Sequence, residues 1–217
     1  MDTPQDFNGD TWVAFADLCG TKAMYAQSPK TAARALDCFY EAAFALVQRA
    51  PQVNGIAVTD CAFFWLTCES GERPMIGEGL GELLGLLKSL HERLLRGKYL
   101  LRSTVAYGHF QYDRRRQLPR LMKGMAIGKA YLDAYLLNDQ YVPGSIMIVK
   151  APEERTPDDY APQLLACLLS GGQNGPWEYI WWAESGIPVG VEEAQRQRDE
   201  AYDGRFDRLM RAYRGRR

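Results

Sequence analysis

Two aspartates, Asp17 and Asp60, are the residues of this chain with the clearest chemical potential. Each follows a short apolar run, over 12–16 and 55–59. Burying a carboxylate is costly unless a cation or a hydrogen-bond donor satisfies it. Two carboxylates from neighbouring strands supply the oxygen ligands of a Mg²⁺ or Mn²⁺ site that carries a nucleoside triphosphate. For either residue taken alone, a solvated aspartate at a strand end is the alternative interpretation.

The composition is that of a globular protein. The 217 residues are 47% hydrophobic and 24% charged, which suits one domain with a sizeable core. The formal net charge of −1 provides no field that would attract nucleic acid or an anionic membrane, so we expect neither as a direct partner. No apolar run approaches the length of a membrane span. The five cysteines show no metal-ligand spacing and indicate reduced thiols in a cytoplasmic protein: Cys19, Cys38, Cys61, Cys68 and Cys167.

Hydrophobic periodicity predicts the elements that must hold the two aspartates. Strands are expected over 12–18, 53–59, 62–67, 100–110, 145–149 and 177–183, and helices over 31–49, 80–95, 124–137, 160–169 and 192–214. A turn is expected over 20–22, after the first strand. Asp60 falls at the tip of the hairpin that joins the second and third strands.

This order of elements favours an α+β fold with a ferredoxin-like core, in which helices pack on a mixed or antiparallel sheet. We expect residues 1–150 to form that core. Residues 151–217 differ in composition, because they begin with a charged, proline-containing stretch and end in a highly charged helix. We expect them to be a C-terminal extension, a strand plus the charged helix, that packs on the core.

Four segments together resemble the catalytic domain of class III adenylate and guanylate cyclases. They are FADLCG over 15–20, VTD over 58–60, LRSTVAYG over 101–108 and GMAIGKAY over 124–131. The resemblance implies a class III cyclase core with two Mn²⁺ or Mg²⁺ ions, held by Asp17, Asp60 and the backbone carbonyl of Leu18. One ion would lower the pKa of the ribose 3′-hydroxyl, and both would clamp the triphosphate. The 3′-oxygen then attacks the α-phosphorus, and pyrophosphate leaves.

The resemblance also implies how the substrate is held. The phosphates would meet the turn after the first strand, formed by Cys19, Gly20, Thr21 and Lys22. The usual polar residues of the late helix are not retained, so Lys129 or Arg102 would stabilise the transition-state charge. Class III cyclases build this site between subunits, which implies a head-to-tail homodimer.

One branch of the family fits the base pocket best, namely the pyrimidine cyclases of bacterial Pycsar antiphage systems. Purine cyclases carry a polar base-reading residue four positions before the second aspartate, where this chain has Ile56 in the pocket. An apolar side chain cannot bond a purine edge. That branch carries an arginine where Arg102 stands, and a guanidinium can donate to the two carbonyls of uracil.

The resemblance to this branch therefore implies conversion of UTP to cyclic UMP, a second messenger for antiphage defence that a separate effector protein senses. Two alternatives stay open. Cytosine also offers a carbonyl, so the substrate can instead be CTP and the product cCMP. The fold can also be degenerate and bind a nucleotide without turnover. For Arg102 itself, a salt bridge at a strand end is the alternative interpretation.

Overall fold

The computed structural model describes residues 4–67, 76–114, 125–140, 145–148, 168–170 and 176–181. The strands are β1 (Phe7–Leu18), β2 (Val53–Val58), β3 (Cys61–Leu66), β4 (Leu101–Asp113), β5 (Met125–Ile127), β6 (Ile146–Ile148), β7 (Leu168–Ser170) and β8 (Trp177–Tyr179). The helices are α1 (Thr21–Gln27), α2 (Pro29–Val47), α3 (Ile76–Arg96) and α4 (Lys129–Asn138).

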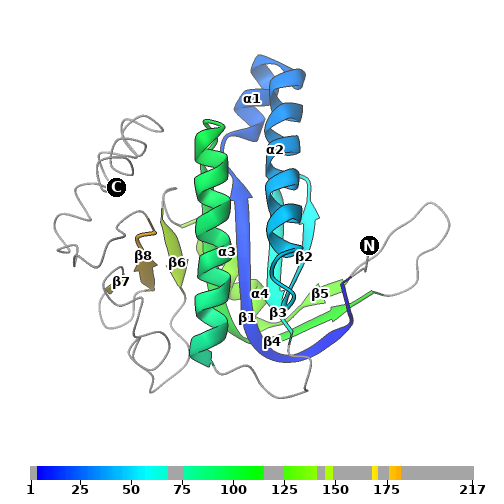
Figure 1. Cartoon of the computed structure of the whole chain (residues 1–217), viewed down its shortest axis with the longest axis vertical. Coiled ribbons are helices and arrows are strands. Elements are labelled where there is room, and N and C mark those ends of the chain that lie inside the picture. Colours follow the sequence, from blue (N-terminus) through cyan, green and yellow to red (C-terminus); the bar gives the residue numbers. More distant parts are fainter. Residues whose placement is uncertain are drawn as a thin grey trace.

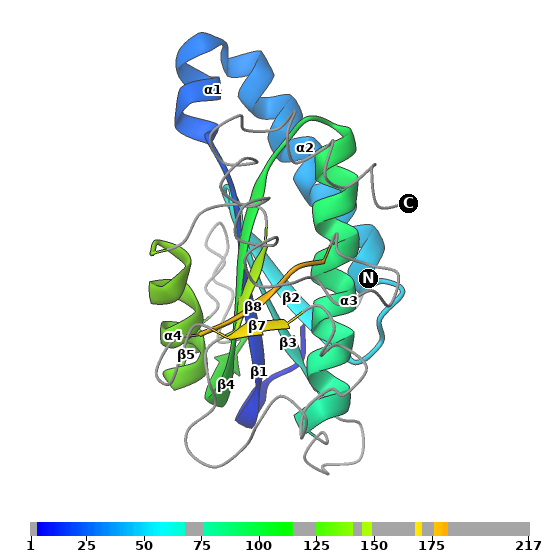
Figure 2. The same ribbon diagram turned by 90° about the vertical axis from the view of Figure 1, so that its left-hand side faces the viewer.

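One mixed sheet forms the centre of the molecule (Figure 1). Its strand order is β2-β3-β1-β4-β6-β8-β7, and β5 pairs with β4 beside this path. The pairs are antiparallel except for β4 and β6, which run parallel. Helices α2 and α3 cover one face of the sheet, and α4 covers the other (Figure 2). The expected α+β class, with a mixed sheet and helices packed on it, is therefore confirmed.

Strand β1 lies in the middle of this sheet because its sequence is apolar on both sides. Trp12, Val13, Ala14, Phe15 and Ala16 are all buried. A strand covered by helices on both faces loses the alternation of polar and apolar residues, which explains this continuous run. Asp17 follows this run near the strand end and is half-buried, whereas the next residue, Leu18, is buried again.

Helix α4 lies close to β4 because glycine occupies the position before it. Gly128 has φ +137°, and a Cβ there would lie 2.3 Å from the carbonyl oxygen of His109. Only glycine permits this approach. Beyond it, Ala130 and Ala134 are fully buried one turn apart, and Thr104 on β4 donates a hydrogen bond of 2.5 Å to the Ala134 carbonyl. The first two turns of α4 are thereby fixed on β4.

Three expectations about local structure are wrong. The predicted turn over 20–22 is shorter and earlier: the turn is formed by Cys19 and Gly20, which has φ +82°, and helix α1 already begins at Thr21. The predicted helix over 124–137 begins as strand β5, since pairing with Gln111–Asp113 of β4 overrides local preference.

The third concerns the predicted helix over 160–169, whose last two residues lie in β7. They pair with β8, and β8 pairs with β6, so the ladder decides their conformation. The rest of that helix and the charged helix over 192–214 lie outside the described residues. The division at residue 150 stays a prediction.

Candidate active site

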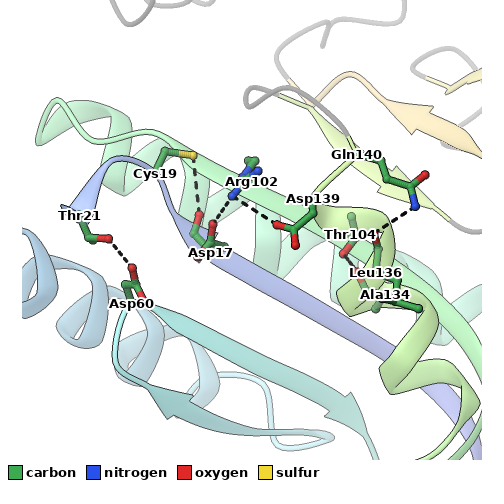
Figure 3. A network of polar contacts seen from close by, with 10 residues as sticks. All are labelled: Asp17, Cys19, Thr21, Asp60, Arg102, Thr104, Ala134, Leu136, Asp139 and Gln140. Atoms are coloured by element: carbon green, nitrogen blue, oxygen red, sulfur yellow. Dashed lines mark hydrogen bonds and ion pairs between the residues drawn. The ribbon is translucent and has the colours of Figure 1, made fainter. Parts of the chain in front are cut away.

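The fold brings Asp17 and Asp60 together at one end of the sheet. Asp17 lies beside Cys61 in the register that joins β1 to β3, and Asp60 stands in the two-residue turn before Cys61. The Leu18 N–H donates to the Asp60 carbonyl over 2.8 Å, which ties the end of β1 to this turn. Figure 3 shows Asp17 near the end of β1 and Asp60 in the turn that leads into the neighbouring strand β3. The predicted convergence of the two aspartates is present in the structure.

Arg102 provides the counter-charge for Asp17. The two residues are register partners on β1 and β4, and Arg102 Nη2 donates to Asp17 Oδ2 over 2.8 Å. The same nitrogen lies 3.8 Å from Asp139, just past the end of α4. The buried Nε of Arg102 has no hydrogen-bond partner within the described part of the chain. Arg102 thus forms the strand-end salt bridge that was the alternative interpretation.

Burial and the ion pair act on Asp17 in opposite directions. Burial raises the pKa of Asp17, whereas the hydrogen bond and the charge of Arg102 lower it, and the nearby Asp60 raises it again. The net pKa lies above its ordinary value. A further cation close to Asp17 would stabilise the ionised carboxylate and lower this pKa.

Among the described residues, Asp60 is held by hydroxyl groups and not by a cation. Thr21, the first residue of α1, donates its hydroxyl to Asp60 Oδ2, and Thr59 donates to Oδ1 over 3.1 Å. Both donors are neutral, so they orient the carboxylate without cancelling its charge. Thr21 was expected at the phosphates, but its side chain lies on Asp60. The sequence predicted a turn at Thr21, so it gave no signal for this contact, which depends on α1 beginning at that residue.

The other residues of the predicted phosphate turn lie beside the aspartates. The Cys19 N–H donates to the Leu100 carbonyl over 2.9 Å and is therefore already used. Lys22 is exposed on the first turn of α1, after Gly20. Burial raises the pKa of the Cys19 thiol to about 12 and that of the Cys61 thiol to about 11. Both thiols are protonated at neutral pH, which disfavours them as nucleophiles or metal ligands.

Two further predicted site residues are engaged in other contacts within one chain. Ile56 is half-buried and packs against a cluster that includes Val13 and Trp65. Lys129 begins α4 and forms an ion pair with Asp133. The opposite end of this 10-residue helix, about 15 Å away, is the one that reaches Arg102. A single subunit therefore does not bring Lys129 to the aspartates.

The donor set fits Mg²⁺ or Mn²⁺. Two carboxylates and the Leu18 carbonyl are hard oxygen ligands, the kind these ions prefer. Within the described ranges, no group of three or more histidine, cysteine, aspartate or glutamate side chains could hold a metal by itself. Mg²⁺ sites of nucleotide enzymes commonly use one or two carboxylates and take further ligands from the substrate phosphates and water. Asp17 and Asp60 match that pattern.

Several solved structures that are similar to this one are nucleotide cyclases. The adenylyl cyclase CyaB from P. aeruginosa has a TM-score of 0.57 and 12% identity, covering 86% of this chain and 100% of its own. The guanylyl cyclase domain of the RhoGC fusion protein from the fungus Blastocladiella emersonii has a TM-score of 0.62 and 11% identity, covering 81% and 97%. The guanylate cyclase domain of RhGC from Catenaria anguillulae, in complex with GTP, has a TM-score of 0.58 and 13% identity, covering 81% and 97%.

These likenesses establish the fold: the chain has the architecture of class III cyclase catalytic domains, as the sequence resemblance implied. No family model and none of the curated proteins compared with the sequence matches it. Within the described residues, no helix combines the length and the apolar character needed to cross a bilayer.

Proposed function

We propose that this protein is a nucleotide cyclase that converts a pyrimidine nucleoside triphosphate, UTP in the first place, to the cyclic monophosphate and pyrophosphate. The observation that carries the proposal is the meeting of Asp17 and Asp60 at adjacent strand ends. This pair stands in a fold shared with adenylyl and guanylyl cyclases. The ribose 3′-oxygen attacks the α-phosphorus, the bond from that phosphorus to the bridging oxygen breaks, and pyrophosphate departs.

In this mechanism, Asp17, Asp60 and the Leu18 carbonyl would hold Mn²⁺ or Mg²⁺, two ions per site. The ions supply a lowered pKa at the 3′-hydroxyl and neutralise the triphosphate charge. Thr21 and Thr59 keep the Asp60 carboxylate in one orientation. The Arg102 guanidinium, which pairs with Asp17, would also be able to donate to the substrate. The exposed Lys22, on the first turn of α1, would donate to the phosphates.

The choice of a pyrimidine depends on Ile56 and Arg102. Ile56 packs among apolar side chains, which supports a pocket without the polar group that a purine edge requires. Arg102 retains an unused buried Nε donor in addition to its bond to Asp17, and a guanidinium can serve pyrimidine carbonyls. Uracil offers two carbonyls, so UTP is favoured over CTP. The product would act as a second messenger in antiphage defence, sensed by a separate effector protein.

A head-to-tail homodimer would complete the site. Helix α4 exposes Leu132 at 50% and Leu136 at 57%, and β5 exposes Ile127 at 51%. Large apolar side chains exposed on one element and its neighbour suit burial in an interface. In such a dimer the partner subunit's Lys129 reaches the aspartates that Lys129 of the same chain cannot reach.

A second function, nucleotide binding without turnover, is favoured by one observation. The Asp17 carboxylate already has a cation in Arg102, so this protein can keep the aspartate for structure alone. The two functions differ in what happens to the triphosphate.

The test is turnover of ATP, GTP, CTP and UTP with Mn²⁺, measured for the wild type, Asp60→Asn and Asp37→Asn. Asp37 is an exposed aspartate on α2 and serves as the matched control. Formation of cyclic UMP that is lost in Asp60→Asn and kept in Asp37→Asn supports the proposal. Formation of a cyclic purine nucleotide would show a purine nucleotide cyclase and overturn the proposed pyrimidine specificity. Mn²⁺-dependent binding of a nucleotide with no product would leave the binding function.

A further inference from the structure

The turn that carries Asp60 has an unusual backbone. Thr59 has φ +53°, and among the described residues other than glycine only Lys98 shares a positive φ. The left-handed region is unfavourable for a β-branched side chain, because the side chain crowds the backbone. A tight hairpin turn of this kind would ordinarily place glycine at such a position. Threonine therefore remains in this conformation only because surrounding contacts impose it.

One of those contacts comes from another element of the fold. The Tyr40 hydroxyl, on α2, donates a hydrogen bond to the Thr59 carbonyl. The Tyr40 ring packs beside Phe39 and against the main core, so the hydroxyl is held in place from the helix side. Burial, together with nearby Cys61 and Asp60, raises the pKa of Tyr40, so the phenol stays protonated and able to donate.

The Thr59 carbonyl belongs to the peptide that leads directly into Asp60. Rotation of Thr59 toward negative φ would turn that peptide and move the Asp60 carboxylate. The Leu18 N–H holds the far side of Asp60 through its carbonyl, and the Thr59 hydroxyl holds the carboxylate itself. The hydrogen bond from Tyr40 holds the other side of the turn, at the carbonyl of Thr59, the residue with the positive φ.

We infer that Tyr40 is a positioning residue for the metal site: its hydrogen bond keeps Thr59 left-handed and so aims Asp60 at Asp17. The inference rests on the proposed function, because it assigns a cation to the two aspartates. It adds a link between α2 and the site, through a residue that touches neither metal nor substrate.

The experiment measures Mn²⁺ affinity of the nucleotide-free full chain by electron paramagnetic resonance, with a thermal melt of each variant to confirm folding. Tyr40→Phe keeps the ring and removes the hydroxyl. We expect it to weaken Mn²⁺ binding by about 3- to 10-fold, the loss that corresponds to one hydrogen bond. The matched control is Tyr25→Phe, since Tyr25 is 64% exposed on α1. It should bind Mn²⁺ as the wild type does.

The decisive comparison uses Thr59→Gly, because glycine adopts a positive φ without strain. In the Thr59→Gly background, adding Tyr40→Phe should change Mn²⁺ affinity by less than about 2-fold, so the two substitutions are not additive. An equal loss in both backgrounds would show that Tyr40 acts through packing and would overturn the inference. Wild-type affinity in Tyr40→Phe would overturn it as well.

Failure of the proposed function has a different signature. A wild type that binds Mn²⁺ but turns over no nucleotide removes the cyclase and leaves the positioning role of Tyr40 measurable. A wild type that binds no Mn²⁺ rejects the metal site, and the inference is rejected with it.

Discussion

The Arg102 guanidinium donates to the Asp17 carboxylate over 2.8 Å, across the register that joins β4 to β1. Asp60, the second carboxylate of the site, is held by the neutral hydroxyls of Thr21 and Thr59. An incoming cation therefore competes with a guanidinium at Asp17 and with no cation at Asp60 in the described part of the chain. This asymmetry makes the two aspartates unequal before any ligand binds.

Removing the Arg102 side chain should separate metal binding from turnover. In Arg102→Ala, Asp17 loses its competing cation, so we expect Mn²⁺ affinity of the nucleotide-free protein to be unchanged or higher. Turnover should fall by about 100-fold or more, because a charge-stabilising donor is lost. Electron paramagnetic resonance and product formation measure the two effects. Arg34→Ala, at an exposed position on α2, is the control. Wild-type turnover in Arg102→Ala would remove Arg102 from the mechanism.

The raised pKa of Asp17 predicts how stability depends on pH. The pKa of the folded state lies above the unfolded value of 3.8, so the fold favours the protonated carboxyl. As the pH rises through these two values, the wild type loses stability relative to a variant that cannot ionise. Asp17→Asn should therefore melt at a higher temperature than the wild type at about pH 7 and at a similar temperature at about pH 3, below both values.

The loss of the ion pair with Arg102 acts against this gain in Asp17→Asn. Arg102 is partly exposed and still lies 3.8 Å from Asp139, so that loss is small. Added Mn²⁺ should stabilise the wild type but not the variant. A variant that becomes progressively less stable than the wild type as the pH rises would contradict the expectation.

His91 should make the fold sensitive to acid. It is buried on α3, with Nε2 3.0 Å from the Ser103 hydroxyl, and burial lowers its pKa from 6.5 to about 3. Below pH 6.5 the imidazole of His91 is protonated in the unfolded chain but stays neutral in the folded chain. The free energy of unfolding therefore falls as the pH drops from 6.5 toward 3. Urea unfolding of His91→Gln across this range should show a shallower pH dependence. His109→Gln, at an exposed histidine, should keep the wild-type slope.

A mixing experiment tests whether Lys129 acts across a dimer interface. Asp60→Ala and Lys129→Ala should each be inactive alone. Mixed in equal amounts and allowed to exchange subunits, they should recover about a quarter of the wild-type activity. Half of the dimers are then mixed, and each mixed dimer has one complete site. Full activity of Lys129→Ala alone would exclude the catalytic role, and no recovery on mixing would exclude action between subunits.

The exposed apolar side chains of α4 predict the effect of a charge at the interface. Leu136, 57% exposed, should tolerate glutamate in the folded monomer, so Leu136→Glu should keep the wild-type melting behaviour. In the dimer the same charge would be buried without a partner, which is costly. Analytical ultracentrifugation should find a monomer, with turnover lost. Glu41→Gln, at an exposed position of α2, should remain dimeric and active. A dimeric, active Leu136→Glu would place the interface elsewhere.

The amino-acid sequence by itself determined the strands that end at the two aspartates. The apolar run before Asp17 and the hairpin around Asp60 are local signals, because burial on both faces and a tight turn leave their mark within a few residues. The α+β class followed from the order of such segments. The predicted helix over 31–49 was confirmed as α2, since Ala32, Ala35 and Phe39 mark its buried face.

Only the tertiary structure decided what surrounds those aspartates. Asp17 and Arg102 are 85 positions apart and meet because the register of β1 and β4 aligns them. Residues 125–127 form strand β5 because they pair with β4. Tyr40 contacts Thr59 because α2 packs over the β2–β3 hairpin. Each of these contacts depends on packing between distant segments, which sets register and approach but leaves no periodic signal in the chain.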